Sequence, residues 1–158
     1  MSTSLSVLGN ALPPATQETI DKIGVIEDRI RQYPQIEFVT EHVFHAGMYA
    51  RTVRISPGIV FTSVLIKIPT LLIVHGCCDM LAGDEWVRLD GYNILPANSG
   101  RKQIYVTRTE VELTMIFPSD VQTVEEAEAQ FTDDGDNLLS RTQTDDLVIV
   151  TGVAACRE

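Results

Sequence analysis

Turn-forming residues break the middle of this chain at short, regular intervals. Between residues 36 and 117, short runs rich in Val, Ile, Thr, Phe and Tyr are separated by Gly, Pro, Asp or Asn about every eight to twelve residues. The connections are too short for helical crossovers, so neighbouring strands are expected to pair antiparallel. The spacing therefore predicts a mainly β domain, built as a sandwich or barrel.

The candidate strands can be placed individually, because each run is bounded by turn residues. They are expected at residues 36–39, 48–55, 59–67, 70–75, 77–82, 85–89, 92–95, 102–107 and 111–117. Residues 96–100 are too small and polar for a strand and are expected to form a loop at a sheet rim. Residues 147–151 are expected to form a last strand or a docked hydrophobic tail.

Helical patterns flank the β region on both sides. Thr16 can cap a helix over residues 16–31 whose apolar stripe must lie against a sheet or across a dimer interface, and Pro34 ends it. After the strands, the spacing from Thr123 to Glu126 is a capping box that predicts a short acidic helix, with another helical turn near residues 138–139.

We therefore divide the chain into an arm and helix at 1–35, a β domain at 36–118 and an acidic helical segment with a tail at 119–158. Residues 1–15 are expected to be a mobile or peripheral arm.

Size and charge exclude several classes of protein. The 158 residues suit one hydrophobic core. The net charge of −10, from 22 acidic and 12 basic residues, is unfavourable for duplex DNA or an anionic membrane. No apolar run approaches the roughly 20 residues that span a bilayer. The uncharged first residues do not resemble a secretory signal, and the three cysteines are expected to be reduced thiols, so we expect a cytoplasmic protein.

Residues 44–117, about half the chain, carry an ordered set of short motifs. The set is His45-Ala46-Gly47-Met48-Tyr49-Ala50-Arg51-Thr52, Pro57-Gly58, Val74-His75-Gly76, Leu89-Asp90-Gly91-Tyr92 and Leu95-Pro96-Ala97. In this order it resembles the small single-domain cupins, especially the short cupin-like proteins of tailed phages. The resemblance implies a cupin-like antiparallel β-barrel or sandwich that encloses a cavity and assembles into a dimer or larger homo-oligomer, in the host cytoplasm if a phage encodes it.

The resemblance fails at the positions that bind metal in cupins. Val64 and Ile66 stand where the first motif has its two histidines, and Thr70 or Leu71 stands at its glutamate. Arg101 stands at the histidine of the second motif. Hydrocarbon side chains offer a metal neither nitrogen nor oxygen. We therefore expect no metal and no cofactor.

Cations near the expected cavity are the candidate ligand-binding residues. Arg101 and Lys102 follow a small loop containing Asn98, and two cations beside exposed backbone N–H groups suit a phosphate or carboxylate, although an ordinary solvated rim is the alternative. Tyr49 and Arg51 alternate along one strand face.

Lys67 and the three histidines are the other residues considered. Lys67 either ends a strand at the surface or reaches into the cavity. His75 is a turn residue unless it lines the cavity as a general acid or base. His42 and His45 should face opposite sides of a strand, which disfavours a shared metal.

Three functions stay open on the sequence. The first is metal-independent binding of a small anionic or nucleotide-like ligand, one version being phage-encoded sequestration of an immune signal. The second is a phage structural or host-interaction oligomer assembled through residues 16–31 and 147–155. The third is an enzyme acting on a sugar or nucleotide. The sequence contains none of the common nucleophile-elbow, P-loop, dinucleotide or zinc-protease motifs, which favours binding over catalysis.

Overall fold

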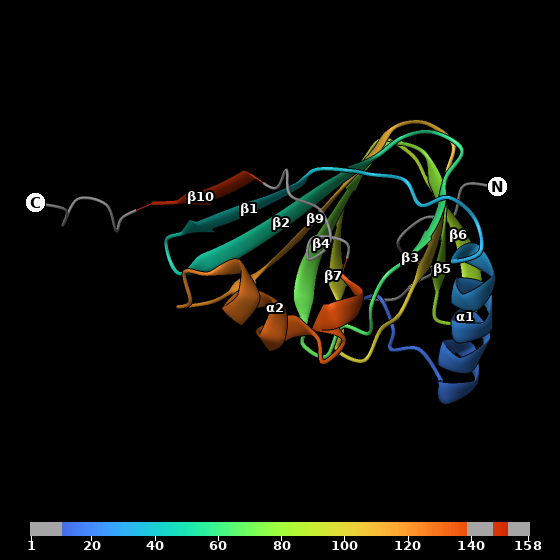
Figure 1. Ribbon diagram of the computed structural model, residues 1–158, viewed down its shortest axis with the longest axis horizontal. Helices are drawn as coiled ribbons and strands as arrows, with labels where there is room; N and C mark the ends of the chain where they lie inside the picture. Colours follow the sequence, from blue (N-terminus) through green and yellow to red (C-terminus); the bar gives the residue numbers. More distant parts are fainter. Residues whose placement is uncertain (1–10, 139–146, 152–158) are drawn as a thin grey trace, which may run out of the picture.

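The chain consists mainly of β-strands, with one helix before them and another near the end (Figure 1). This computed structural model describes residues 11–138 and 147–151. The helices are α1 (Gln17–Ile30), α2 (Val124–Phe131) and a 3₁₀ turn, η2 (Gly135–Asn137). The strands are β1 (Thr40–His45), β2 (Met48–Ile55), β3 (Val60–Thr62), β4 (Thr70–His75), β5 (Cys78–Ala82), β6 (Glu85–Leu89), β7 (Tyr92–Ala97), β8 (Ile104–Thr107), β9 (Val111–Pro118) and β10 (Leu147–Val150). The predicted mainly β class, with its two flanking helices, is confirmed.

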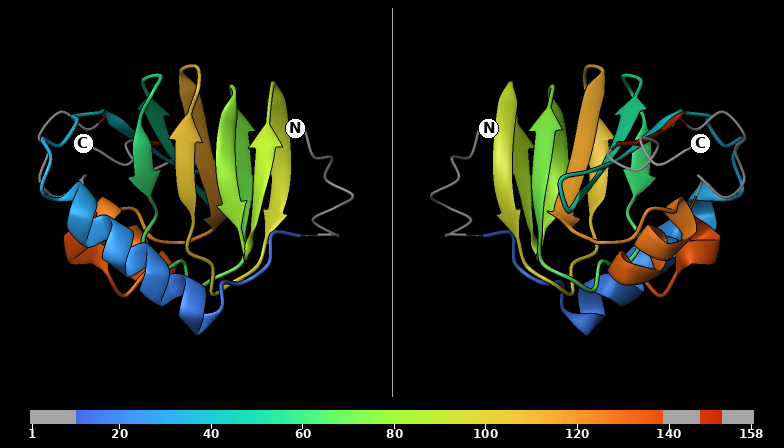
Figure 2. Two further views of the ribbon diagram at one scale, coloured as in Figure 1. Left: turned by 90° about the vertical axis from the view of Figure 1, so that its right-hand side faces the viewer. Right: turned by 90° about the vertical axis from the view of Figure 1, so that its left-hand side faces the viewer.

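Two sheets face each other as a sandwich rather than closing into a barrel. One has six strands in the order β10-β1-β2-β9-β4-β7, and the other has four in the order β3-β8-β5-β6. Figure 2 shows both helices at the same end of the strands. The buried core lies between the sheets, where Leu72 and Val74 of β4 join Met80 of β5 and Val87 of β6.

The strand pairs are antiparallel, as expected, except at one edge. β10 runs parallel to β1, with Glu41 opposite Leu147 and Phe44 opposite Val150. The antiparallel prediction rested on the short connections between residues 36 and 117 and did not extend to β10, which follows β9 after a long segment that contains α2.

Two predicted strands were wrong in position or length. The first strand begins at Thr40, whereas the predicted 36–39 is irregular. The predicted strand 59–67 is regular only over β3, because the chain then bends toward the segment before β8. There Ile66 forms an isolated bridge with Arg101, which fixes the position of that arginine.

The loop predicted at 96–100 is shorter than expected, because β7 continues to Ala97. The arm before α1 pairs with this end of β7, since Leu12 N–H donates to Pro96 O at 2.7 Å and Ala15 N–H to Gly100 O at 2.9 Å. Leu12 is buried in the core. Residues 11–15 therefore dock against the sheet, whereas the rest of the predicted arm lies outside the described residues.

Helix α1 forms as the sequence predicts and packs on the four-stranded sheet. Thr16 Oγ1 accepts a hydrogen bond from Thr19 N–H at 3.2 Å, which makes Thr16 the N-cap. Ile23 is fully buried, and the Thr19 hydroxyl donates to Asp84 in the β5–β6 turn at 2.5 Å. Of the expected apolar stripe, Val25 remains 69% exposed.

Helix α2 begins at the predicted capping box, with Thr123 Oγ1 accepting from Glu126 N–H at 3.3 Å. The helical turn predicted near residues 138–139 is wrong in position: η2 covers Gly135–Asn137, Leu138 is extended, and residue 139 lies outside the described residues. Across the described residues, neither helix reaches the length and apolar character that crossing a bilayer requires.

Candidate ligand site

A cavity of about 170 Å³ lies between the two sheets. Its walls come from β2, β4 and β9 of the larger sheet, from β3 and β8 of the smaller sheet, and from α2 and η2. The described lining is mostly apolar and consists of Phe38, Arg51, Val53, Phe61, Thr62, Ser63, Val64, Ile66, Leu72, Arg101, Gln103, Tyr105, Leu113, Met115, Phe131, Asn137 and Leu138.

A tight turn places Arg101 in this cavity. Gly100 has φ of 77°, a left-handed conformation that favours glycine. Its N–H donates to Ile66 O at 2.7 Å, and Ile66 N–H donates to Arg101 O at 2.9 Å. The side chain of Arg101 then points inward, leaving the residue only 2% exposed.

The buried guanidinium of Arg101 has no ion pair among the described residues. Its Nη1 donates to Asn98 O at 3.1 Å and its Nη2 to Thr70 Oγ1 at 2.7 Å, and both acceptors are neutral. Its Nε is buried without a hydrogen-bond partner. Burial lowers the pKa of Arg101, yet an arginine keeps its charge in proteins. The lining therefore includes a positive charge without an ion pair among the described residues, and two of its five N–H donors have an acceptor there.

Tyr105 and Gln103 form the wall next to Arg101. The Tyr105 hydroxyl donates to Gln103 Oε1 at 2.9 Å, and its ring stacks on Phe61 with centroids 4.7 Å apart and planes 7° apart. Burial raises the pKa of Tyr105, which keeps the phenol neutral. The stacking and the hydrogen bond hold both rings in fixed orientations.

Arg51 is the second cation of the cavity and, unlike Arg101, is neutralised. Its Nη1 lies 3.1 Å from Glu128 Oε2, and its guanidinium lies over the Phe131 ring, 5.6 Å from the centroid. Glu128 and Phe131 are both buried on α2. The ion pair therefore fixes α2 against β2 at this end of the cavity.

Lys102 points away from Arg101, into a second and more polar cavity of about 190 Å³. Its Nζ lies 2.8 Å from Glu27 Oε1, which also accepts from Thr62 Oγ1 at 2.8 Å. Successive residues in an extended segment face opposite sides, so the two cations do not form one cluster. Arg101 and Lys102 are both buried, so they do not form the solvent-exposed rim that was the alternative prediction.

The remaining candidates lie outside the described lining of the first cavity. Tyr49 is fully buried and its hydroxyl lies 2.7 Å from His42 Nδ1. Lys67 is at the surface, 2.6 Å from Asp133. Asn98 is exposed, and only its backbone oxygen reaches Arg101.

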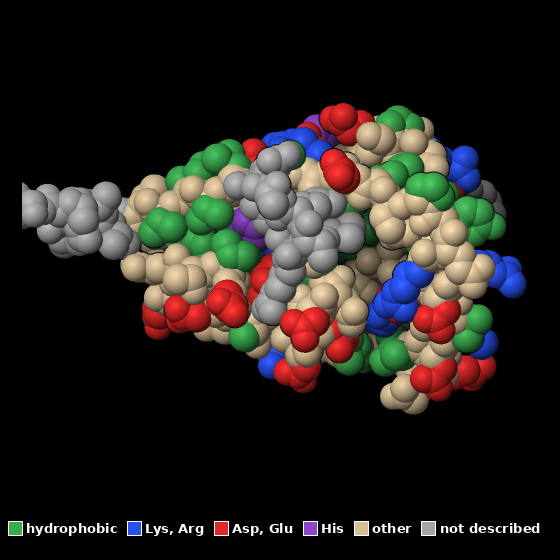
Figure 3. All heavy atoms as spheres, in the orientation of Figure 1, with side chains coloured by type: hydrophobic (Ala, Val, Ile, Leu, Met, Phe, Trp, Pro, Cys, Tyr) green, Lys and Arg blue, Asp and Glu red, His purple; other side chains and the backbone are tan. Residues whose placement is uncertain are grey.

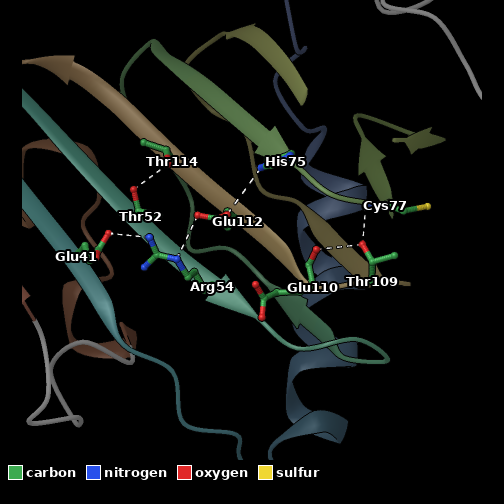
Figure 4. A network of polar contacts seen from close by, with 9 residues as sticks. All are labelled: Glu41, Thr52, Arg54, His75, Cys77, Thr109, Glu110, Glu112 and Thr114. Atoms are coloured by element: carbon green, nitrogen blue, oxygen red, sulfur yellow. Dashed lines mark hydrogen bonds and ion pairs between the residues drawn. The ribbon is translucent and has the colours of Figure 1, made fainter. Parts of the chain in front are cut away.

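His75 lies on the outer face of the six-stranded sheet, in a polar network separate from the cavity (Figure 4). Its Nδ1 is 3.7 Å from Glu112, and Arg54 bridges Glu112 and Glu41 at 3.1 Å each. Arg54 directly follows the cavity residue Val53 in β2, and alternation along the strand turns it to the opposite face. Of the seven predicted site residues, the structure brings Arg51 and Arg101 together in the cavity.

The residues at the cupin ligand positions do not fit a metal ion. Val64 and Ile66 line the cavity with hydrocarbon, and Thr70 Oγ1 accepts from the Arg101 cation. His42 is buried whereas His45 is exposed, so they face opposite sides of β1 as expected. Within residues 11–138 and 147–151, no three His, Cys, Asp or Glu side chains lie close enough together to hold a metal.

Sequence reasoning missed Gln103 and Tyr105, although a signal for them was present. Arg101, Gln103 and Tyr105 stand at alternate positions, and alternate residues of a strand share one face. The neighbouring pair Arg101 and Lys102 was predicted because both side chains are charged, although neighbours in a strand face opposite sides. Phe61 and Phe131 come from segments that are distant in the sequence, so no local sequence pattern predicts that they line the cavity.

Comparisons with known proteins add a likeness of fold. No family model and no curated protein sequence matches this chain. The solved structures that it resembles include cupins. A cupin-2 domain protein from Shewanella frigidimarina has a TM-score of 0.42 and 13% identity, over 59% of this chain and 91% of that one.

Two further solved structures show the same degree of likeness. A cupin superfamily protein from Desulfitobacterium hafniense has a TM-score of 0.44 and 11% identity, over 56% of this chain and 83% of that one. Salicylate 1,2-dioxygenase from Pseudaminobacter salicylatoxidans has a TM-score of 0.45 and 12% identity, over 81% of this chain and 41% of that one. Likeness at this level identifies neither ligand nor activity.

Proposed function

We propose that this chain is a metal-independent, cupin-like protein that binds a small anionic molecule in the cavity between its sheets. The observation that carries the proposal is Arg101, a buried cation without an ion pair among the described residues, whose Nε lacks a partner. A carboxylate placed beside it would supply both the missing charge and the missing acceptor.

The energetics of burial support an anionic ligand. An uncompensated buried charge is unfavourable by several kcal/mol, because neutral acceptors replace hydration only in part. An anion entering the cavity would recover part of that energy as binding energy. The net charge of −10 opposes anions at long range, so the attraction must come from the local charge of Arg101.

The same lining favours binding over catalysis. It offers guanidinium, hydroxyl and amide groups, and the described lining residues include no carboxylate or imidazole that would take a proton near pH 7. An enzyme acting on a sugar or nucleotide remains the alternative. It would need its acid and base from outside the described lining.

A nucleotide-like ligand, such as a sequestered immune signal, would need more room than the first cavity has. A nucleotide comprises a base, a sugar and a phosphate, and the cavity has space for about one of the three. The second cavity shares Phe38, Phe61 and Val64 with the first, so a nucleotide would have to span both. In that arrangement Lys102, rather than Arg101 alone, would contact the phosphate.

Calorimetric titration of the full chain tests the proposal. Acetate, benzoate, inorganic phosphate and adenosine monophosphate are titrated into the native protein, Arg101→Met and Arg54→Met. We expect a carboxylate to bind the native protein and Arg54→Met alike, and Arg101→Met to bind at least tenfold more weakly. Binding of no anion, or equal binding by Arg101→Met, would overturn the proposal. Binding by adenosine monophosphate alone would favour the nucleotide version.

A second candidate function, assembly of copies of this chain, rests on β10. Leu147, Val148 and Ile149 are 48%, 45% and 42% exposed, so apolar side chains lie on both faces of this edge strand. Figure 3 shows hydrophobic side chains gathered at the end of the molecule where β10, β1 and β2 lie. Strands that are apolar on both faces are usually buried on both faces.

The open edge of β10 suits a second copy of this chain, and we propose β10 as the contact. β10 lies at the end of its sheet, and within the described residues only β1 pairs with it. Thr151 N–H donates to Phe44 O on β1, so by alternation the N–H of Val148 points outward. An unpaired backbone edge of this kind readily accepts another strand.

Light scattering of the full chain tests this candidate. We expect a dimer or larger oligomer for the native protein and a smaller species for Val148→Pro, because proline removes an outward N–H. Trp86→Lys changes an exposed residue of the other sheet and should leave the mass unchanged. A monomeric native protein, or an oligomer that survives Val148→Pro, would contradict assembly through β10.

A further inference from the structure

We infer that the ligand is a monocarboxylate carrying a single ring. This inference rests on the proposed function and specifies its ligand class. It follows from the volume of the cavity, the aromatic rings that line it and the charge of Arg101, which has no ion pair among the described residues.

The volume of the cavity fits one ring. An engineered apolar protein cavity of about 150 Å³ binds benzene. The present cavity, at about 170 Å³, therefore has room for a six-membered ring and little more. A short acid such as acetate would leave most of the space unfilled, and a fused ring system would extend beyond it toward the second cavity, which shares Phe38, Phe61 and Val64 with it.

Two aromatic rings that stack on each other line the cavity beside Arg101. The Phe61 and Tyr105 rings are nearly parallel, and the hydrogen bond from Tyr105 to Gln103 fixes their orientation. Leu113 and Met115 of β9 contribute apolar side chains from the larger sheet. A planar ring can contact the aromatic wall over its edge or face while aliphatic and thioether groups contact the rest of it.

The polar groups of the lining limit the charge of the ligand to about one. Arg51 is already neutralised by Glu128, and the Ser63 hydroxyl accepts from Gln103 N–H. The Thr62 hydroxyl donates to Glu27. Arg101 Nε is the buried lining donor without a partner among the described side chains. Arg101 carries a single positive charge, which a carboxylate matches better than a phosphate, since a phosphate carries more charge.

Isothermal titration of the full chain with matched ligands tests the inference. The ligands are benzoate, cyclohexanecarboxylate, acetate, benzamide and inorganic phosphate. We expect benzoate and cyclohexanecarboxylate to bind at least tenfold more tightly than acetate, because the ring adds apolar contact. Benzamide has the shape of benzoate without its charge, and we expect it to bind at least tenfold more weakly.

Two variants separate the ring from the charge. Leu113→Trp fills the space for the ring and should reduce benzoate affinity at least tenfold while leaving acetate affinity within about twofold. Leu71→Trp, on the outer face of the larger sheet, is the matched control and should change neither. Circular dichroism of both variants confirms that each is folded.

The outcomes distinguish this inference from the proposed function. Equal affinity for acetate and benzoate, or tighter binding of phosphate than of either, would overturn the single-ring ligand while leaving anion binding at Arg101 intact. Equal affinity for benzamide and benzoate would show that charge is not recognised and would overturn both. Absence of binding by every ligand would also overturn both.

Discussion

At the residue scale, the proposed site depends on Arg101, a buried cation. Thr70 and Asn98 each accept one hydrogen bond from its terminal nitrogens, so the side chain is held in one position, but neither neutralises its charge. A cation fixed in this way is preorganised for an anion, because little conformational entropy remains to be lost on binding.

Replacing Arg101 by Met should therefore stabilise the ligand-free protein. Exchanging buried charges for apolar groups of similar size has raised stability by about 1–4 kcal/mol in other proteins, and we expect a gain at the lower end here because two hydrogen bonds are lost. Urea denaturation of native and variant protein without ligand measures the difference. Lower stability of Arg101→Met would mean that an unseen partner already neutralises Arg101.

A second residue, Asp79, should make stability depend on pH in the acidic range. The hydrogen bond from Arg88 lowers the pKa of Asp79, assisted by Arg108 Nη2 at 2.7 Å. Its folded pKa thus lies below the unfolded value of about 3.9, so the stabilisation is present above that pH and is lost as the pH falls through the folded pKa.

Thermal unfolding of native protein and Asp79→Asn between pH 7 and pH 2 checks this expectation. The variant should be less stable at pH 7, and the difference should shrink as the pH falls below about 4. Asp90→Asn, which replaces an exposed carboxylate, serves as the control. A difference between native and Asp79→Asn that stays constant over the whole range would contradict the ion pair.

At the scale of elements, α2 depends on a buried ion pair for its position. Glu128 is 1% exposed and pairs with Arg51 of β2, and Phe131 of the same helix packs against Phe117 with centroids 6.1 Å apart. Because α2 closes one end of the cavity, the Arg51–Glu128 ion pair affects both the stability of the protein and the shape of the cavity.

Glu128→Gln should destabilise the protein by about 3–5 kcal/mol, since it leaves Arg51 buried without its charge partner. Glu125→Gln, at an exposed position of the same helix, should change stability by less than about 0.5 kcal/mol. Urea denaturation compares the two variants. Equal stabilities would show that the Arg51–Glu128 pair does not hold α2.

For the whole molecule, the sequence predicts those features that depend on local pattern. The turns between residues 36 and 117, the cap at Thr16 and the capping box at Thr123 gave the strand-rich class and both helices. Strand limits failed where long-range pairing decides them, as when Ile66 bridges to Arg101 rather than extending β3.

The site was predictable in part, for the same physical reason. Arg101 was predicted as a cation that follows a small polar loop, and alternation along the chain would have added Gln103 and Tyr105. Phe61, Met115 and Phe131 reach the cavity only because two sheets and a helix fold around it. No pattern in one segment reveals that its side chains will meet those of another.

The central claim is that an anion binds at Arg101 Nε, and an arginine Nε–H NMR spectrum measures this group directly. In a ¹H–¹⁵N correlation of the full chain, the Nε–H signal missing from Arg101→Lys identifies the residue. We expect that signal to shift as benzoate is added, and the signal of Arg54, identified with Arg54→Lys, to stay in place. An Arg101 signal that does not move at saturating benzoate would contradict the account.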